Sequence, residues 1–235
     1  MKRRDFLIGG ASLGLSAVSG AALARQPARS PSGGVRPLAR PANGPIRVAV
    51  AISEGVTVID FAGPWEVFQD VMLPGDDDMP FALYTVAATK DVVEGSGGLK
   101  IVPDHTFASA PDPRVVIVPA QKGSPELHAW LRKMAGSADV VASVCTGAFQ
   151  LAKAGLLSGK RATTHHEFTD QLASRFPDVK VEKGLRFVEN ERVSTAGGLS
   201  SGIDLALHVV ERYFGRSVAE RTAAYMEYQG KGWIV

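Results

Sequence analysis

The stretch of sequence that decides the fold is Val140-Val141-Ala142-Ser143-Val144-Cys145-Thr146-Gly147-Ala148-Phe149-Gln150-Leu151. Its first five residues are mostly β-branched and predict a short buried strand, and the apolar positions that follow Thr146 predict a helix. Cys145, the single cysteine among 235 residues, then lies in the turn between the strand and the helix. A strand-to-helix turn of this kind is a nucleophile elbow, which presents its central residue at the edge of a sheet.

The predicted position of Cys145 at the start of a helix indicates a reactive thiol. Unpaired backbone N–H groups and the positive end of the helix dipole stabilise a thiolate, so we expect the pKa of Cys145 to lie below its usual value of about 8.5. The alternative is a small buried hydrophobic residue that ends a strand. The strand-Cys-Thr-Gly-helix context favours the functional interpretation.

The first 24 residues resemble a twin-arginine export signal. Arg3-Arg4 precedes a moderately apolar stretch rich in glycine, alanine and serine, and Ala22-Leu23-Ala24 has the small-x-small pattern of a cleavage site. A membrane anchor or a buried helix is the alternative, but glycines dilute the apolar run, which is shorter than the ~20 strongly apolar residues of a span. The sequence therefore predicts cleavage after about Ala24 and a periplasmic protein.

The charge balance argues against polyanionic partners. Cleavage after Ala24 removes three basic residues and one acidic residue, which leaves 23 of each and a neutral mature chain. Without a basic block we expect no nucleic-acid partner and no membrane association after cleavage.

A single cysteine forms no internal disulfide, so the fold depends on its core. Outside the cell, the thiol of Cys145 must be protected by burial or must use its oxidation.

A proline-rich segment separates the predicted signal from one domain. Residues 25–45 contain five prolines and almost no large apolar side chains, which predicts a disordered linker. Residues 46–235 have the length of a single domain with a substantial core.

Within that domain, β-branched runs alternate with helical patterns. This alternation predicts an α/β fold with a doubly wound, flavodoxin-like, mostly parallel sheet and helices on both faces. We expect strands at 46–52, 81–87, 115–118, 140–144 and 162–164 and near Val188 and Val193, a hairpin or an excursion from the sheet at 95–102, and helices beginning at Pro64 and spanning 124–134, 146–154, 167–176, 201–214 and 217–228. Ligands bind outside the carboxyl ends of such strands, so the loops after Ile52, Val118, Val144 and Thr164 should converge around Cys145.

Five motifs stand out along the domain. They are Val58-Ile59-Asp60-Phe61-Ala62-Gly63-Pro64-Trp65-Glu66-Val67-Phe68, Val116-Ile117-Val118-Pro119, Ser143-Val144-Cys145-Thr146-Gly147-Ala148, Arg161-Ala162-Thr163-Thr164-His165 and Thr195-Ala196-Gly197-Gly198. Their order resembles that of the ThiJ/PfpI superfamily, and residues 46–230 resemble the branch that contains isonitrile hydratase and the sensor domains of AraC-type regulators. The resemblance implies an architecture like that of class I glutamine amidotransferases, and a homodimer. It leaves the reaction open, because the superfamily includes proteases, glyoxalase-like enzymes, hydratases, chaperone-like proteins and non-catalytic sensors.

The resemblance also implies roles for single residues. It implies Cys145 as nucleophile, Thr146 as a hydroxyl donor and Asp60 as the carboxylate that handles the proton. Protease-like members have histidine directly after the cysteine, so Thr146 argues against a peptidase. The usual Gly-Gly after the strand's proline is replaced by Ala120-Gln121, whose backbone N–H groups, with Gly147, are the candidate oxyanion donors.

Several of these residues also have purely structural interpretations. Asp60 is either catalytic or an N-terminal cap, and Glu66 is either a carboxyl beside the cysteine or the third residue of a helix capped by Gly63. His165 is a candidate general acid, base or ligand contact, or else a histidine satisfied by backbone at a strand end. Trp65 is a candidate pocket wall or a core residue.

Taken together, these features favour a cysteine-dependent hydratase or hydrolase that acts on a small, largely uncharged electrophilic carbon. The most specific version is hydration of an isonitrile to an N-substituted formamide. No cofactor and no metal are expected, because the spacing of His165, His166 and Glu167 matches no zinc pattern. Two alternatives remain open, a periplasmic binding or sensing module and a glyoxalase-like or redox-protective protein.

Overall fold

The computed structural model describes residues 36–75 and 79–235. The predicted signal peptide and the first part of the predicted linker lie outside these residues. The main sheet consists of β1 (Ile46–Ala51), β2 (Phe81–Ala87), β5 (His105–Thr106), β6 (Val115–Val118), β7 (Val140–Ser143), β10 (Phe187–Glu189) and β11 (Val193–Ala196). Its spatial order is β10-β11-β7-β6-β1-β2-β5, and only the β10–β11 pair is antiparallel.

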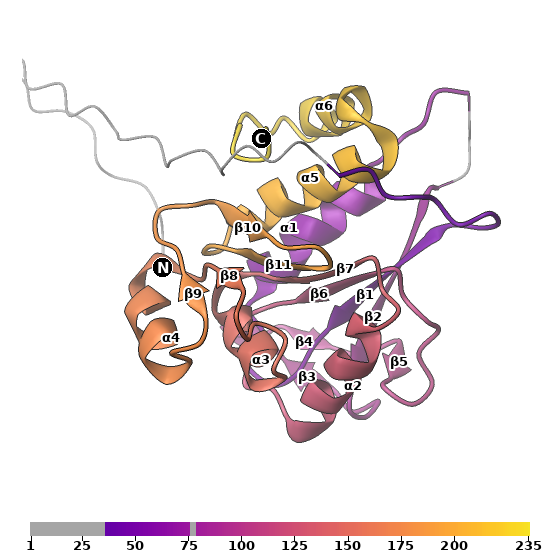
Figure 1. The fold of residues 1–235 in the computed structure, drawn as a ribbon. Helices are drawn as coiled ribbons and strands as arrows, with labels where there is room; N and C mark the ends of the chain where they lie inside the picture. Colours follow the sequence, from indigo (N-terminus) through magenta and orange to yellow (C-terminus); the bar gives the residue numbers. More distant parts are fainter. Residues whose placement is uncertain (1–35, 76–78) are drawn as a thin grey trace, which may run out of the picture.

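Helices cover both faces of this sheet (Figure 1). One layer contains α1 (Val58–Gln69), α5 (Ser201–Phe214) and α6 (Arg216–Tyr225), and the other contains α2 (Pro125–Ala135), α3 (Ala148–Lys153) and α4 (Thr169–Arg175). The remaining elements are short: β3 (Val93–Glu94), β4 (Lys100–Ile101), β8 (Arg161–Ala162), β9 (Lys180–Val181) and the single turns η1 (Ser96–Gly98), η2 (Cys145–Gly147) and η3 (His166–Phe168). The predicted α/β fold with a mostly parallel sheet is confirmed.

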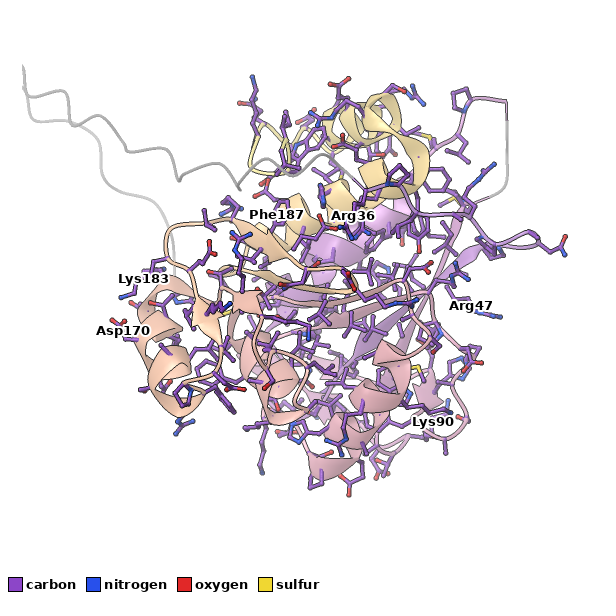
Figure 2. The ribbon with its side chains drawn as sticks, viewed as in Figure 1. Arg36, Arg47, Lys90, Asp170, Lys183 and Phe187 are labelled. Atoms are coloured by element: carbon purple, nitrogen blue, oxygen red, sulfur yellow. The ribbon has the colours of Figure 1, made fainter. Side chains whose placement is uncertain are left out.

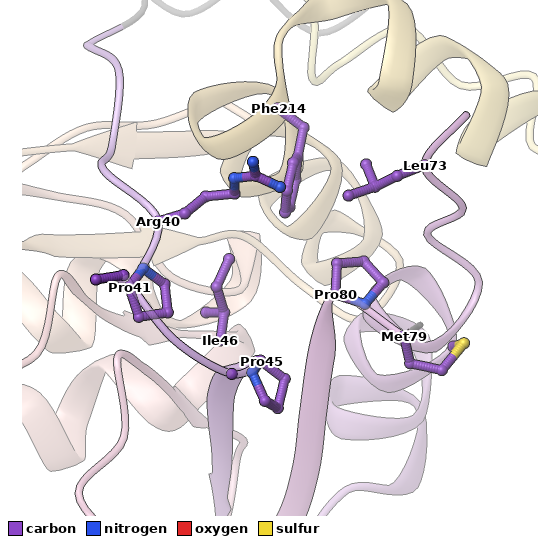
Figure 3. Close-up of a pocket in the computed structure, with 10 residues that line it drawn as sticks. Arg40, Pro41, Pro45, Ile46, Leu73, Met79, Pro80 and Phe214 are labelled. Atoms are coloured by element: carbon purple, nitrogen blue, oxygen red, sulfur yellow. The ribbon is translucent and has the colours of Figure 1, made fainter. Parts of the chain in front are cut away.

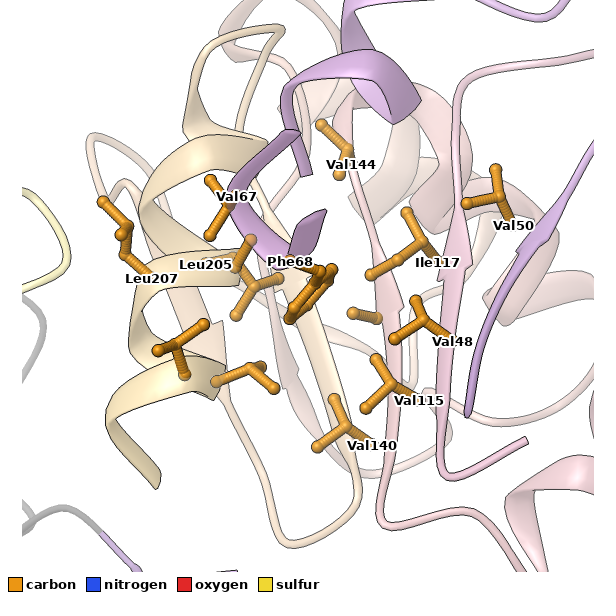
Figure 4. Packing of buried hydrophobic residues seen from close by; sticks show 14 of the residues in the cluster. Val48, Val50, Val67, Phe68, Val115, Ile117, Val140, Val144, Leu205 and Leu207 are labelled. Atoms are coloured by element: carbon orange, nitrogen blue, oxygen red, sulfur yellow. The ribbon is translucent and has the colours of Figure 1, made fainter. Parts of the chain in front are cut away.

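Alternation along β1 shows why the sheet needs two layers of helices. Val48 and Val50 point into a core with Phe68 of α1, which Figure 4 shows, whereas Ala49 and Ala51 belong to the core beneath α2 and α3. A strand buried on both faces has a nearly continuous apolar sequence, as β1, β6 and β7 do. The chain passes from β1 to β2 on one side and later to β6 on the other, so the sheet has its topological switch point between β1 and β6.

The predicted start of the first helix is wrong. Helix α1 begins at Val58, six residues before Pro64, which lies inside it. The proline ring is buried against α5, where a Cβ on Gly202 would meet Pro64 Cγ at 3.1 Å. Tertiary packing thus compensates for the helix hydrogen bond that a proline cannot donate. The Gly63-Pro64 pair marks a close contact between two helices and not a helix start.

Other boundaries differ less. The hairpin expected at 95–102 is present as β3 and β4. The helix expected from Thr146 begins as the turn η2 before α3, and the one expected from Glu167 begins as η3 before α4. The strand expected at 162–164 is limited to β8, Arg161–Ala162.

The described end of the predicted linker contacts the domain. Residues 36–45 contain no helix or strand, but the guanidinium of Arg212 donates to the carbonyl of Arg36 at 2.9 Å, and Leu38 N–H donates to the carbonyl of Arg212 at 2.7 Å. These contacts fix the backbone of this segment on α5. The same segment borders a cavity of about 560 Å³ at the starts of β1 and β2 (Figure 3), lined also by Leu73, Met79 and Phe214.

Cys145 follows the opposite, carboxyl end of the sheet, so this first cavity is remote from the predicted site. Among residues 36–75 and 79–235, no helix is both long enough and apolar enough to cross a membrane.

Candidate active site

Cys145 lies directly after β7 in the predicted strand-to-helix turn. Its backbone has φ of +56°, a left-handed conformation that is uncommon for any residue other than glycine. Two hydrogen bonds hold it: Cys145 N–H donates to the carbonyl of Gly197 at 2.8 Å, and the hydroxyl of Thr164 donates to the carbonyl of Cys145 at 2.8 Å. Strained backbone that is fixed by its surroundings is typical of functional sites.

Gly147 allows this turn to pack against the end of β6. A Cβ at this position would lie 2.0 Å from the carbonyl oxygen of Val118 and 2.8 Å from that of Pro119. Both neighbours are backbone atoms, so neither moves aside without shifting the strand end. Only glycine fits here, and this close contact sets the distance between the elbow and the β6 loop.

The carboxyl group of Asp60 approaches the same point from α1. Asp60 is fully buried in the first turn of the helix, and its Oδ2 accepts a hydrogen bond from Ala120 N–H at 3.0 Å. Its Oδ1 is also buried and has no nitrogen or oxygen partner, while the Cys145 thiol lies close enough to interact with the carboxylate. The N-cap of α1 is Thr57, so Asp60 does not have the alternative role of N-cap.

Burial controls the protonation of both groups. Desolvation raises the pKa of Asp60 to about 6, although hydrogen bonds from Ala120 and Cys145 oppose this shift. Desolvation and then the negative charge of Asp60 raise the pKa of Cys145 to about 11. The expectation of a lowered thiol pKa is therefore wrong, because a one-turn η2 and a six-residue α3 stabilise the thiolate less than burial beside a carboxylate destabilises it. At neutral pH the pair is a thiol facing a carboxylate.

Three donors surround the sulfur of Cys145. The backbone N–H groups of Thr146 and Leu199 and the hydroxyl of Thr146 each favour the thiolate and lower the pKa of Cys145. Leu199 lies in the loop between β11 and α5 and, with φ of +50°, is also left-handed. Leu199 was not predictable from the sequence, since it contributes a backbone N–H that any residue has. Only the preceding Gly197-Gly198 signalled a loop that approaches the site.

Two of the three predicted oxyanion donors have other partners. Ala120 N–H is bonded to Asp60, and Gly147 N–H donates to the carbonyl of Val144 at 3.0 Å within the turn. The side-chain amide of Gln121 donates to the carbonyl of Ala51 at 2.8 Å and so ties the loop after β6 to the end of β1, while the role of the Gln121 backbone N–H stays a prediction. The backbone N–H groups that interact with the sulfur are those of Thr146 and Leu199.

Two residues predicted on α1 make no polar contact with the thiol. Glu66 is exposed, and it is not the third residue of its helix, because α1 begins at Val58 and not after Gly63. Trp65 is half-buried against the core of the α1 layer, with its indole N–H donating to Gln69 Oε1 at 3.2 Å. Neither residue is among the groups that shift the pKa of Cys145.

His165 lines a cavity of about 530 Å³ beside the elbow, together with Thr164 and Leu199. Its Nδ1 accepts a hydrogen bond from Glu167 N–H at 3.3 Å, and its ring lies on that of His166 with the centroids 4.4 Å apart. A Cβ on Gly198 would meet its Cδ2 at 2.3 Å. Its ring therefore packs against the loop that carries Leu199 and does not bond to the thiol.

Ion pairs neutralise the charges in the wall of this cavity. Lys183 pairs with Asp170 at 2.5 Å, and Arg186 pairs with the buried Asp204 at 2.5 Å. Figure 2 labels Lys183 and Asp170 at the same edge of the molecule. The cavity thus offers neutral polar and apolar surface to a small molecule. Within the described part of the chain, no three histidine, cysteine, aspartate or glutamate side chains are arranged to hold a metal ion.

Comparison with known proteins agrees with this geometry. Residues 46–212 match the DJ-1/PfpI family. The chain belongs to this family. The isonitrile hydratase of Pseudomonas putida is 32% identical over 191 residues, which cover 78% of each chain.

Two solved structures extend the comparison. A ThiJ/PfpI family protein from Pseudomonas syringae superposes with a TM-score of 0.70 at 31% identity, covering 80% of this chain and 77% of that one. An AraC family transcriptional regulator from Pseudomonas putida has a TM-score of 0.68 at 22% identity, covering 77% of this chain and all of that one, and shares the fold. The predicted family is confirmed, and an isonitrile hydratase and an AraC family regulator are among the proteins similar to this chain.

The contact of Gly147 with the β6 loop predicts a large effect of one methyl group. We expect Gly147→Ala to lower the free energy of unfolding by about 3 kcal/mol, because the new Cβ meets backbone that cannot yield. Urea unfolding measures the change. Gly136→Ala is the matched control, since this glycine has φ of −78° and its Cβ would have 3.4 Å to the nearest atom. Equal stability of the two variants would contradict the interpretation.

Burial of Asp60 predicts a stability that decreases as the pH rises. The pKa is about 6 in the folded protein against an ordinary 3.8, so the folded state binds more protons between these values. We expect Asp60→Asn to be more stable than the wild type by about 1–3 kcal/mol at pH 7 and equally stable near pH 4. Urea unfolding at both pH values tests this, with the exposed Glu66→Gln as a control that changes neither. A gain that is equal at both pH values would exclude the titration of Asp60 as its cause.

Proposed function

We propose that this protein is a cysteine-dependent hydratase that adds water to a small electrophilic carbon, with conversion of an isonitrile to an N-substituted formamide as the leading reaction. The observation that carries the proposal is the buried pair of the Cys145 thiol and the Asp60 carboxylate, with the donors of Thr146 and Leu199 around the sulfur. The similarity to an isonitrile hydratase at 32% identity supports the choice of reaction.

The pair starts with one shared proton. In the resting state the proton is on the sulfur of Cys145, and Asp60 is the base that accepts it. Sulfur then bonds to the terminal carbon of the isonitrile, and protonated Asp60 returns the proton to that carbon. The product of this step is a thioimidate, in which the carbon carries hydrogen, sulfur and a C=N bond.

Water completes the reaction. Asp60, again a carboxylate, removes a proton from water as its oxygen bonds to the thioimidate carbon, and the nitrogen gains a proton. The carbon–sulfur bond then breaks, the sulfur regains a proton, and the N-substituted formamide leaves. The N–H groups of Thr146 and Leu199 stabilise the negative charge that develops on sulfur, because they already favour the thiolate in the free protein. This sequence consumes one water and no oxidant, reductant or cofactor.

Export through residues 1–24 and pairing into a homodimer remain predictions from the sequence.

A binding or sensing role is the alternative for the same site, since the fold is shared with an AraC family regulator. Turnover distinguishes the two, because a sensor binds its ligand and leaves it unchanged.

Replacement of the nucleophile tests the proposal directly. We expect Cys145→Ala to lower kcat for isonitrile hydration by at least about 10³, because the covalent route is lost. Formamide production, followed by mass spectrometry, gives the rate, and near-identical thermal unfolding of both proteins shows that the fold persists. Full turnover by Cys145→Ala would refute the mechanism. Binding of the isonitrile by the wild type without any turnover would favour the sensing role.

The pH dependence tests the direction of proton transfer. Asp60 must be ionised to act as a base, so kcat/KM should fall about tenfold per pH unit below the pKa of about 6 and stay level from about pH 7 to 9. Asp60→Asn should remove the acid limb and lower the rate by about 10² to 10⁴. Glu66→Gln is the matched control and should keep the wild-type profile. An acid limb that persists in Asp60→Asn would assign the base to another residue.

A further inference from the structure

A third cavity, of about 230 Å³, is lined in part by Thr146. Three basic side chains from three separate elements line it: Lys122 in the loop after β6, Lys153 at the end of α3 and Arg175 at the end of α4. These residues are distant in sequence, and the packing of α3 and α4 beside the β6 loop brings them together. No acidic side chain lines this cavity.

The charge of this cavity is not compensated. Among the residues that the structure describes, Lys122, Lys153 and Arg175 form no ion pair, whereas the larger cavity has Lys183 and Arg186 each paired with an aspartate. The backbone carbonyl of Glu54 accepts from Lys122 N–H at 3.1 Å, but the carboxylate of Glu54 accepts from Glu94 N–H at 3.4 Å and forms no ion pair with Lys122. Three cations without an acid produce a local positive potential.

A buried glutamine forms part of the lining of this cavity. The side-chain amide of Gln150 donates to the carbonyl of Gln121 at 2.9 Å, and its oxygen is paired with His128 Nε2 at 2.9 Å. Gln150 is 3% exposed, so this part of the wall is fixed and neutral. The positive groups therefore lie around a rigid polar surface rather than above an anionic one.

Thr146 connects the cavity to the nucleophile. Its side chain lines the cavity, and its hydroxyl also interacts with the sulfur of Cys145. A molecule whose reactive carbon lies at the sulfur can therefore extend past Thr146 toward the three cations. We propose that this cavity binds an anionic group of the substrate, so that the molecules which react at Cys145 are small electrophiles carrying a carboxylate. The assignment of a substrate class rests on the proposed hydratase function. The binding of an anionic group in this cavity does not depend on that function.

Alkylation of Cys145 tests the binding without any turnover. Iodoacetate and iodoacetamide are nearly equal in size and differ in charge, and in each reaction a sulfur–carbon bond forms, iodide leaves with the electrons of the carbon–iodine bond, and the thiol proton passes to Asp60 or solvent. Because the chain has one cysteine, the rate of mass gain reports Cys145 alone. The quantity measured is the ratio of the iodoacetate rate to the iodoacetamide rate.

We expect the double variant Lys153→Gln/Arg175→Gln to lower this ratio about 5- to 20-fold, because two solvent-accessible charges attract iodoacetate with modest energy. The rate with the neutral iodoacetamide should stay within twofold of the wild type. Raising the ionic strength from 0.02 to 0.5 M should reduce the wild-type ratio toward that of the variant, since salt screens exposed charges. Arg132→Gln/Lys133→Gln, which removes two exposed charges from the end of α2, is the matched control and should leave the ratio unchanged. An unchanged ratio in the cavity variant, or an equal fall in the control, would overturn the proposal.

Turnover then tests the substrate class. Isocyanoacetate should be hydrated with a kcat/KM about 5- to 20-fold above that of its neutral amide, and Lys153→Gln/Arg175→Gln should remove this preference. Equal turnover of both compounds by the wild type would overturn the assignment of a carboxylate. If neither compound is hydrated, the proposed function fails, while the alkylation ratio still decides whether the cavity selects anions.

Discussion

The contact between the Asp60 carboxylate and the Cys145 thiol is the interaction on which this site depends. Asp60 comes from α1, its second oxygen is held by Ala120 after β6, and Cys145 follows β7, so one buried carboxylate links three segments at the carboxyl edge of the sheet. Burial raises the pKa of both groups. The result at neutral pH is a protonated thiol beside a carboxylate, with one proton between them. A cysteine at a helix N-terminus differs, because there the helix end stabilises the thiolate.

The site concentrates several unfavourable features. Cys145 and Leu199 are both left-handed, and Asp60 keeps an oxygen without a nitrogen or oxygen partner. Each of these features costs stability. The two apolar cores on either face of the sheet supply the compensating free energy. This division agrees with a rigid fold that holds a strained site for chemistry at the sulfur.

Some features were predictable from the sequence and others were not, for identifiable reasons. The β-branched runs at β1, β6 and β7 and the elbow were predictable, because a strand buried on both faces needs apolar side chains throughout. The start of α1 was not, because the Gly63-Pro64 pair, which is typical of a helix start, instead packs against α5. Leu199 was missed, since its contribution is a backbone N–H. The convergence of Lys122, Lys153 and Arg175 was also invisible, because nothing in their local sequence shows which elements become neighbours.

By itself, the sequence determined the layered fold, its DJ-1/PfpI membership and the place of Cys145, the candidate nucleophile, at the elbow, because periodicity and short motifs are local properties of a chain. Only the tertiary structure decided the protonation of Cys145 and Asp60, the donors around the sulfur and the charge of the cavity beyond Thr146. These properties depend on desolvation and on distances between segments far apart in sequence. Cys145 therefore changes from a thiol expected to ionise easily into one whose pKa is raised by burial beside Asp60, so that it stays protonated at neutral pH.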